Sequence, residues 1–442
     1  MSDSWLWMTA ADLGRGLEAE TIDARELTEV YLAAIDGHPQ GTGIYARTMP
    51  ERARAEADAA ANRARVGLRR GLLDGVPVSW KDLFDSAGVA TEAGSALLRD
   101  RVPDTDAEVL ARASRAGLVA LGKTHMTELA FSGLGLNPMT ATPPNINDPE
   151  LAPGGSSSGA ATSVAFGLAA AGIGSDTGGS VRVPSAWNDL VGLKTTHGLL
   201  SLAGVVPLCP RFDTVGPLCR SVEDAALLLA LLGGPSTDLA GAVLSGARLL
   251  VLDDPALEPT RPEPRAAFED AVSRLAAAGA RVTRSAAPMI GEALALAPLL
   301  FAPEAYGIWG ETIEARPDLM FVPVRERFRA GATVPAPDFV RGWRALDALR
   351  ASYHAATAAY DAVLVPTAPN LPPNVDRLLS DAEYFATENL LTLRNTRIGN
   401  LLGGCSLTLP TGEPSCGVSL MAPPGAESRL LRLGAAAEGA LG

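Results

Sequence analysis

The chain has 442 residues, of which 47% are hydrophobic and 20% charged, with 45 glycines and 33 prolines. This composition is typical of a loop-rich globular enzyme and excludes fibrous and intrinsically disordered proteins. The net charge of −13 argues against nucleic acid or an anionic membrane as a direct partner, because binding to either depends on clusters of Lys and Arg.

Helical patterns dominate the N-terminal segment. Apolar residues recur at helical spacing over residues 9–36 and predict two short helices that join near Glu20. Residues 50–66 are rich in Ala and Arg and predict a third helix. We therefore expect residues 1–66 to form an N-terminal helical segment.

An α/β core follows, in which short apolar runs alternate with Gly and Pro. The first run, residues 76–81, is strand-like. Thr105 and Glu108 match a capping box for a helix that ends at Gly117, and residues 118–121 predict a buried strand directly after it. This succession of helix and strand is typical of α/β proteins.

Small residues fill positions 157–171 and predict a helix that can pack unusually closely on its neighbours. A short strand at residues 173–175 follows, and it leads into a turn at Gly178 and Gly179.

The C-terminal half predicts a further set of strands. A β-α-β pattern is predicted, with strands at residues 249–252 and 280–283 and a helix at about 264–278 between them. Residues 361–366 predict a later buried strand. The intervening residues 285–350 are rich in Pro, Arg and aromatic residues, and they predict a helical cap over a pocket.

Two last strands, at residues 406–410 and 417–421, are expected to close the sheet before a final helix from Glu427. No internal repeat or low-complexity linker divides the chain. We therefore expect a single large α/β/α domain, with a central mixed sheet covered by helices on both faces.

Cys, His and Lys are rare, and their rarity limits the chemistry. The four Cys show no Cys-x-x-Cys spacing, so neither a zinc ribbon nor a disulfide framework is predicted, and a reduced, cytoplasmic setting is expected. The four His are widely spread, which leaves few candidates for a three-His metal site or a Ser-His-Asp triad. Three Lys remain against 34 Arg. Since Arg cannot release its proton, a retained Lys is a candidate for chemistry that Arg cannot perform, with chance retention as the alternative.

The sequence shows no signal for export or membrane insertion. No basic region followed by an apolar run opens the chain, and no 18 uninterrupted apolar residues occur. The protein is expected to be soluble.

Two segments match the sequence patterns of well-known motifs, but the secondary structure predicted around them differs from what each motif requires. Residues 117–124 match the P-loop, but a helix precedes them and the residues between the glycines are themselves strand-like, so no nucleotide site is predicted. Residues 155–159 match the nucleophile elbow with Ser157 as nucleophile, but residues 147–153 are not a strand and no His-Gly-Gly-Gly loop is present.

Lys81 and two glycine-flanked serine loops remain as candidate chemistry. The loops, residues 153–159 and 174–182, hold hydroxyls close to bare backbone N–H groups, which is what a nucleophile beside an oxyanion hole requires. A lysine can act as the base where burial lowers its pKa. For either loop alone, a tight turn that starts a helix is the simpler interpretation.

Taken in order, these motifs resemble the amidase signature family of serine hydrolases. Lys81 lies in a Val-x-x-Lys-Asp context, and Ser156 follows 75 residues later in a Gly-Gly-Ser-Ser run. Ser180 follows 24 residues after that, at the end of Gly-Ser-Asp-Thr-Gly-Gly-Ser. Both intervals equal those of the family. The resemblance is strong over residues 70–235 and looser toward both ends.

The resemblance implies a role for each matching residue. Ser180 would be the nucleophile, Ser156 a relay serine after a cis peptide bond at Gly155, and Lys81 the base. The backbone N–H groups expected to form the oxyanion hole are those of Thr177, Gly178, Gly179 and Ser180. The expected supporting residues are Gly155, Ser157, Asp176 and Arg182. The resemblance also implies three parts of the domain after the N-terminal helices, namely a catalytic signature core (70–235), a variable substrate-pocket region (236–390) and closing strands with a C-terminal helix (391–442).

Three departures from the family pattern concern loop shape. Ser158 and Ala160 stand where the family usually has Gly and Ser, and Thr195 stands where Pro usually follows Gly-Leu-Lys. None of them removes a catalytic group.

The activity implied is hydrolysis of a small carboxamide to a carboxylic acid and ammonia or an amine, through an acyl-enzyme and with no metal or organic cofactor. The partner implied is a small-molecule amide, without nucleic acid or membrane, and a homodimer is allowed.

The alternative is the A subunit of a glutamine-dependent tRNA amidotransferase. That protein usually has a Ser-Ser-Thr-Glu-Asn-Ser run where this chain has residues 131–138, as stand-alone amidases do. A binding protein with a relic site is disfavoured, because all three catalytic positions are filled.

The substrate pocket is the least determined part. Residues 285–400 are expected to line it, and Ala130 matches a position beside the reacting carbonyl in related enzymes. Arg394 or Arg397 could bind a substrate carboxylate, although solvated surface is the default interpretation of both. The aromatic residues of the region, Phe301 among them, fit the core and the pocket equally well.

Overall fold

The computed structural model describes residues 2–442, and one eleven-stranded sheet runs through it. The strands lie in the order β1-β3-β2-β4-β6-β5-β10-β11-β9-β7-β8. Their bounds are β1 (Tyr45–Thr48), β2 (Pro77–Lys81), β3 (Val119–Thr124), β4 (Ala171–Asp176), β5 (Val191–Lys194), β6 (Thr214–Cys219), β7 (Arg248–Leu252), β8 (Arg281–Ser285), β9 (Ala362–Pro366), β10 (Cys405–Pro410) and β11 (Gly417–Ala422).

The sheet is mixed, as predicted, and its parallel parts lie toward its two ends. Strand β2 pairs in parallel with β3 and β4, and β7 pairs in parallel with β9 and β8. The pairs between these groups, from β4–β6 through β11–β9, are antiparallel, as is the edge pair β1–β3. The β-α-β unit predicted for the C-terminal half is confirmed as β7, α9 and β8.

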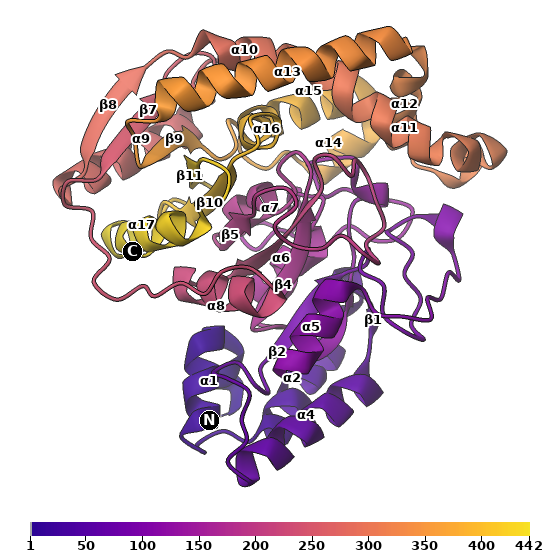
Figure 1. The fold of residues 1–442 in the computed structure, drawn as a ribbon. Helices are drawn as coiled ribbons and strands as arrows, with labels where there is room; N and C mark the ends of the chain where they lie inside the picture. Colours follow the sequence, from indigo (N-terminus) through magenta and orange to yellow (C-terminus); the bar gives the residue numbers. More distant parts are fainter. Residues whose placement is uncertain (1) are drawn as a thin grey trace.

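Helices cover the sheet on both faces (Figure 1). The α-helices are α1 (Ala10–Glu18), α2 (Ala24–Gly37), α3 (Gly41–Ile44), α4 (Pro50–Arg65), α5 (Glu108–Ala116), α6 (Ser158–Ala165), α7 (Arg182–Trp187), α8 (Val222–Leu232), α9 (Pro262–Ala277), α10 (Pro288–Ala295), α11 (Ala297–Ala315), α12 (Val322–Arg329), α13 (Ala336–Thr357), α14 (Val375–Ser380), α15 (Ala382–Thr392), α16 (Arg394–Leu401) and α17 (Glu427–Leu441). Short 3₁₀ helices lie at η1 (Ser2–Trp7), η2 (Ala96–Leu98), η3 (Glu128–Ala130), η4 (Pro317–Leu319) and η5 (Ala330–Thr333). The predicted N-terminal helices are therefore confirmed.

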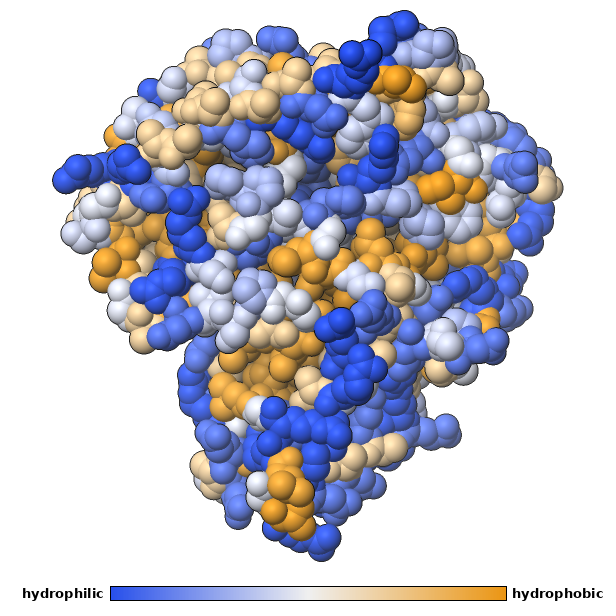
Figure 2. All heavy atoms as spheres, in the orientation of Figure 1, coloured by the Kyte–Doolittle hydropathy of each residue, from blue (hydrophilic) through white to orange (hydrophobic). Residues whose placement is uncertain are grey.

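The cap predicted for residues 285–350 is present as helices α10 to α13. Figure 1 shows them as a layer at the end of the molecule opposite α1 and α4. On the face drawn in Figure 2, hydrophobic atoms gather across the middle of the molecule, below this layer. Residues 288–315 are the one described stretch whose length and hydropathy would also suit a membrane span. Here the stretch is divided into α10 and α11, which pack against α13 and α12.

Two local predictions in the first half are wrong. Helix α5 begins at Glu108 with Ala107 as its N-cap, so Thr105 forms no capping box. The backbone N–H groups of Ala107 and Glu108 instead donate to the carbonyls of Asp85 and Ala203, at 2.8 and 3.0 Å. The N–H groups at the start of α5 are therefore satisfied by carbonyls from distant parts of the chain, and not by the Thr105 side chain as predicted.

The helix predicted over residues 157–171 is shorter than expected. Helix α6 ends at Ala165, and Gly167 then adopts a φ of +73°, which breaks the helix. The predicted close packing is confirmed, because a Cβ atom on Gly172 would lie 2.4 Å from the Ala160 carbonyl oxygen. Helix α6 therefore lies directly against β4, which fixes the two serine loops relative to each other.

The last two strands do not close an edge of the sheet. Strands β10 and β11 lie in its interior, where they join the strands of the first half to the C-terminal β-α-β unit. Both are buried almost throughout, as interior strands with both faces covered are. The sequence pattern predicts two buried strands here, which the structure confirms, but it does not give their place in the strand order.

Candidate active site

Lys81, at the end of β2, contacts two serine hydroxyls in the interior of the protein. Its Nζ atom lies 2.7 Å from Ser156 Oγ and 2.8 Å from Ser175 Oγ. Lys81 and Ser156 are fully buried, and the Gly155–Ser156 peptide bond is cis. The structure thus joins, at hydrogen-bond distance, two residues that lie 75 positions apart in the sequence.

The surroundings of Lys81 favour a neutral amine. Burial lowers the pKa of Lys81 to about 7, although the negative charges of Asp213 and Asp176 oppose the shift. Its hydrogen-bond partners are hydroxyls, which stabilise an ammonium group less than a carboxylate does. A neutral amine can donate to Ser175 and accept a proton from Ser156, so the arrangement suits a base that acts on the Ser156 hydroxyl.

Ser180 lies beside this pair, in the loop after β4. It is 5% exposed and lines a cavity, which leaves its hydroxyl accessible to a small molecule. Its backbone carbonyl accepts from the N–H of Ser157 at 3.2 Å, and this bond ties the two serine loops together. In residues 2–442 the hydroxyls of Ser156 and Ser180 form no direct hydrogen bond, a contact that often tightens only when a substrate is bound.

Ser157 holds the loops in place. It is fully buried, and its hydroxyl donates to the Ser175 carbonyl at 3.1 Å. Because it does not line the cavity, it lacks the exposure that the nucleophile elbow would need.

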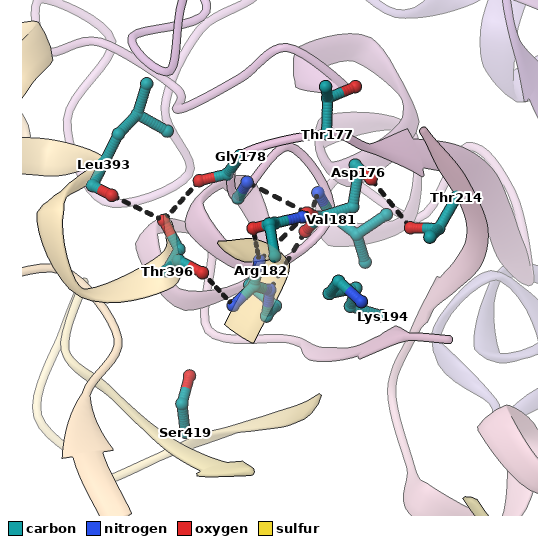
Figure 3. Close-up of polar contacts among 12 residues, drawn as sticks. Asp176, Thr177, Gly178, Val181, Arg182, Lys194, Thr214, Leu393, Thr396 and Ser419 are labelled. Atoms are coloured by element: carbon teal, nitrogen blue, oxygen red, sulfur yellow. Dashed lines mark hydrogen bonds and ion pairs between the residues drawn. The ribbon is translucent and has the colours of Figure 1, made fainter. Parts of the chain in front are cut away.

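A buried ion pair fixes the loop that carries Ser180 (Figure 3). The Asp176 carboxylate accepts from Arg182 Nε and Nη2, at 3.0 and 2.9 Å, and from Asn400 Nδ2 at 2.8 Å. Burial opposes ionisation of Asp176, but the charges of Arg182 and Lys194 outweigh it and lower its pKa to about 2. The same carboxylate accepts from the backbone N–H groups of Gly179 and Val181, so it holds the loop by its main chain.

The oxyanion-hole prediction needs a correction at Gly179. Its backbone N–H donates to Asp176 at 2.9 Å and is therefore committed. The backbone N–H groups of Thr177, Gly178 and Ser180 have no acceptor within the described part of the chain, and all three residues line the cavity. The hydroxyl of Thr177 donates to Asp213 at 2.5 Å. Three free donors beside a buried serine hydroxyl are the material of a site that stabilises a tetrahedral oxyanion.

The cavity has a volume of about 230 Å³, which suits a small organic molecule. One wall belongs to the serine loops and the segment before them, and it comprises Ala130, Phe131, Ser132, Thr177, Gly178 and Ser180. The cap contributes most of the other wall, with Ala297, Pro298, Phe301, Ala302, Arg327 and Ala330. Helices α15 and α16 and the residue between them contribute Leu390, Leu393 and Arg397, and Leu208 completes the lining. The cap therefore covers the pocket, as the sequence predicted.

Arg394 and Arg397 were both candidates for binding a substrate carboxylate, and the structure places only one of them in the cavity lining. Arg397 lines the cavity, so the default interpretation of it as solvated surface is wrong. Arg394 is not among the residues that line the cavity, and it donates to the carbonyls of Ala256 and Pro259. Ala130 lies in the cavity wall as expected, and so does Phe301.

Three contributors to the site were missed. Ser175 contacts Lys81, Asp213 holds Thr177, and Arg327 lines the cavity. Ser175 belongs to the second serine loop, so its place beside Ser180 in the sequence was an available signal. Arg327 stands among many cap arginines with nothing local to distinguish it. Among residues 2–442, no group of three or more His, Cys, Asp and Glu side chains is placed to hold a metal ion, and the four Cys are buried and unpaired.

Comparisons with known proteins find relatives of this chain over nearly its whole length. The family model described as Amidase matches residues 26–431. A 2-amino-5-chloromuconic acid deaminase of Comamonas testosteroni is 36% identical over 456 residues, covering 98% of this chain and 97% of that protein. The A subunit of the glutamyl-tRNA(Gln) amidotransferase of Azotobacter vinelandii (strain DJ / ATCC BAA-1303) is 30% identical over 467 residues, covering 96% of both. A solved structure described as an amidase is 31% identical with a TM-score of 0.88, covering 98% of this chain and 100% of that one.

Proposed function

The chain belongs to the amidase family and is an amidohydrolase, and we propose that it works as a stand-alone amidase on a small carboxamide. The products are a carboxylic acid and ammonia or an amine, and the intermediate is an acyl-enzyme on Ser180. The observation that carries the proposal is the buried amine of Lys81, 2.7 Å from Ser156 Oγ and next to the cavity that Ser180 lines.

The proposed reaction begins with a proton relay. Neutral Lys81 takes the proton of the Ser156 hydroxyl, Ser156 takes that of Ser180, and Ser180 Oγ attacks the amide carbonyl. The lysine becomes an ammonium group at the moment when the substrate carbonyl becomes an oxyanion. A base with a pKa near 7 suits this step, because about half of it is unprotonated at pH 7 and the neutral form still accepts a proton readily.

The oxyanion forms where the backbone N–H groups of Thr177, Gly178 and Ser180 are free to donate. Removing one such donor typically costs about 3–4 kcal/mol of transition-state stabilisation. As the C–N bond breaks, the proton on Lys81 returns through Ser156 to the leaving nitrogen. A water molecule then attacks the acyl-enzyme by the same relay, which frees the acid and restores the Ser180 hydroxyl.

A second candidate is the A subunit of a tRNA-dependent amidotransferase, because the Azotobacter relative is also similar over nearly its whole length. Two observations favour the stand-alone enzyme. Residues 131–138 lack the Ser-Ser-Thr-Glu-Asn-Ser run usual in the amidotransferase, and two of them, Phe131 and Ser132, line the cavity. The deaminase from Comamonas, whose name refers to a small molecule, is the more similar of the two relatives, at 36% against 30% identity.

The test measures ammonia release by the purified chain from aliphatic, aromatic and urea-type amides, together with labelling by a serine-directed fluorophosphonate. We expect turnover without any partner and a label on Ser180 that the substitution Ser180→Ala abolishes. Glutaminase activity that appears only when partner proteins are added would favour the amidotransferase. A label on Ser157 would contradict the assignment of the nucleophile.

A further inference from the structure

Two arginine side chains face a cavity whose other lining residues include no acid. Arg327 comes from α12 in the cap and Arg397 from α16, so two separate elements bring positive charge to one small space. No Asp or Glu is among the described residues that line the cavity, and most of its lining is apolar. Both arginines are partly exposed, and both line this cavity.

Arg327 is held in place by its neighbours without being neutralised. Its Nε donates to the Phe131 carbonyl at 2.8 Å, and its guanidinium lies over the Phe131 ring, 4.6 Å from the ring centroid. Within residues 2–442 its two Nη groups have no acceptor. A guanidinium held in this way keeps its fork of N–H donors available to a ligand.

Arg397 forms fewer side-chain interactions with described residues than Arg327 does. Its guanidinium forms no hydrogen bond or ion pair with any described residue, and its side chain lies against the serine loop. A Cβ atom on Gly178 would lie 4.0 Å from Arg397 Nε. This charge is therefore close to the free N–H groups proposed to bind the oxyanion.

Two cations without an acidic partner face the same cavity. Burial lowers the pKa of Arg397 to about 10, and burial together with the charge of Arg397 lowers the pKa of Arg327 to about 9. Both remain charged at neutral pH. The buried Arg182, by contrast, is paired with Asp176 at 2.9 Å. A charged group inside a protein is normally paired, so the missing partner of Arg327 and Arg397 points to an anionic ligand.

We propose that the substrate carries a carboxylate in addition to its amide, and that Arg327 and Arg397 bind this carboxylate. The proposal rests on the amidase function proposed above and specifies its substrate class. The apolar residues of the cavity lining, such as Ala130 and Phe301, then contact the hydrocarbon part of the substrate. Hydrolysis of such an amide gives a dicarboxylic acid, whose new carboxylate forms at Ser180.

Matched substrate pairs test the proposal on the unmodified protein. Malonamate, succinamate, glutaramate and 4-carbamoylbenzoate each have a diamide that differs only by a neutral carboxamide in place of the carboxylate. We expect kcat/KM for at least one acid to exceed that of its diamide by about 10- to 100-fold, the range of a charge-assisted hydrogen bond. Equal or better turnover of every diamide would overturn the carboxylate proposal and leave the amidase function standing.

Arginine variants then locate the effect. Arg397→Gln and Arg327→Gln should each lower kcat/KM for the preferred acid by about 10-fold or more, mainly through KM, and change that of the diamide much less. Arg394→Gln is the matched control, because it removes the same charge from the same helix outside the cavity and should keep the preference. An unchanged preference in both cavity variants would overturn the assignment of these two residues.

Binding to Ser180→Ala separates this proposal from the proposed function. Calorimetry should show the acid binding at least about 10-fold more tightly than its diamide. If no amide is hydrolysed but this difference is present, the amidase proposal fails and the anion site stands. If neither turnover nor preferential binding occurs with any pair, both proposals fail.

Discussion

Lys81 and Lys123 lie on neighbouring parallel strands, and both are fully buried. Lys81 pairs in register with Thr124 and Lys123 pairs with Trp80, so the two amines leave opposite faces of the sheet. Lys81 contacts the hydroxyls of Ser156 and Ser175. The amine of Lys123 lies 3.3 Å from the Asp82 carboxylate and 2.8 Å from Thr91 Oγ.

A buried lysine becomes a base or stays a fixed cation according to the groups that its amine contacts. Burial lowers the pKa of both, to about 7 for Lys81 and about 8 for Lys123, where the Asp82 charge opposes the shift more directly. A carboxylate partner holds the charge of Lys123 in place, whereas a hydroxyl partner can pass a proton to Lys81. Burial therefore prepares both amines, and the type of contacting group determines which of them can act as a base.

The largest expected effect comes from removing the amine at Lys81. Lys81→Met should lower kcat/KM by at least about 10³-fold, because the proton relay loses its base. The melting temperature should stay the same or rise, since an apolar side chain of similar length replaces a buried amine. Kinetics and calorimetric melting measure the two effects. An inactive variant that had also lost its fold would not support the role, and retention of more than about a tenth of the activity would contradict it.

The equivalent change at Lys123 should lower the stability of the protein and leave its activity nearly unchanged. Lys123→Met leaves the buried Asp82 with only Arg47 as a charged partner, at 2.8 Å, and should lower the free energy of unfolding by about 3 kcal/mol. Urea unfolding measures this loss. The folded variant should keep kcat within a few-fold of the wild type. A loss of kcat as large as that of Lys81→Met would erase the distinction between the two regions.

A smaller effect should appear in the pH profile of the unmodified protein. Because the pKa of Lys81 is about 7 and only the neutral amine is active, kcat/KM should rise about tenfold from pH 6 to pH 8 and then level off. The free energy of unfolding should also rise with pH. The unfolded chain binds a proton that folded Lys81 has lost between about pH 7 and the ordinary value of 10.5, so this group makes the free energy of unfolding rise with pH in that interval. A rate that falls with pH over this range would contradict the base role.

The sequence could predict the elements and the residues of the relay because these depend on local patterns and on fixed spacings. Strands β2, β4 and β9 were predicted within one or two residues, and the intervals between Lys81, Ser156 and Ser180 carried the family resemblance. Lysine is rare in the sequence, and its three occurrences, Lys81, Lys123 and Lys194, are all buried. Composition could not distinguish among them, because the contacting groups come from other parts of the chain.

The remaining features depend on contacts between distant segments. Arg182 bonds to Asn400, 218 residues away, and Arg397 reaches the serine loop from the C-terminal part of the chain. The interior position of β10 and β11 is likewise a matter of strand order, which burial patterns do not encode. No local pattern marks such residues, so the pocket could be expected from the sequence but its charged lining could not.

The most direct test of the account is the substitution Lys81→Arg. Arginine keeps the positive charge and much of the volume but cannot give up its proton, so it separates a base from a cation. Steady-state kinetics on the folded variant should show activity as low as that of Lys81→Met, at least about 10³-fold below the wild type. Recovery by arginine of most of the turnover that methionine loses would mean that Lys81 acts by charge alone, and it would contradict the proposed relay through Ser156 to Ser180.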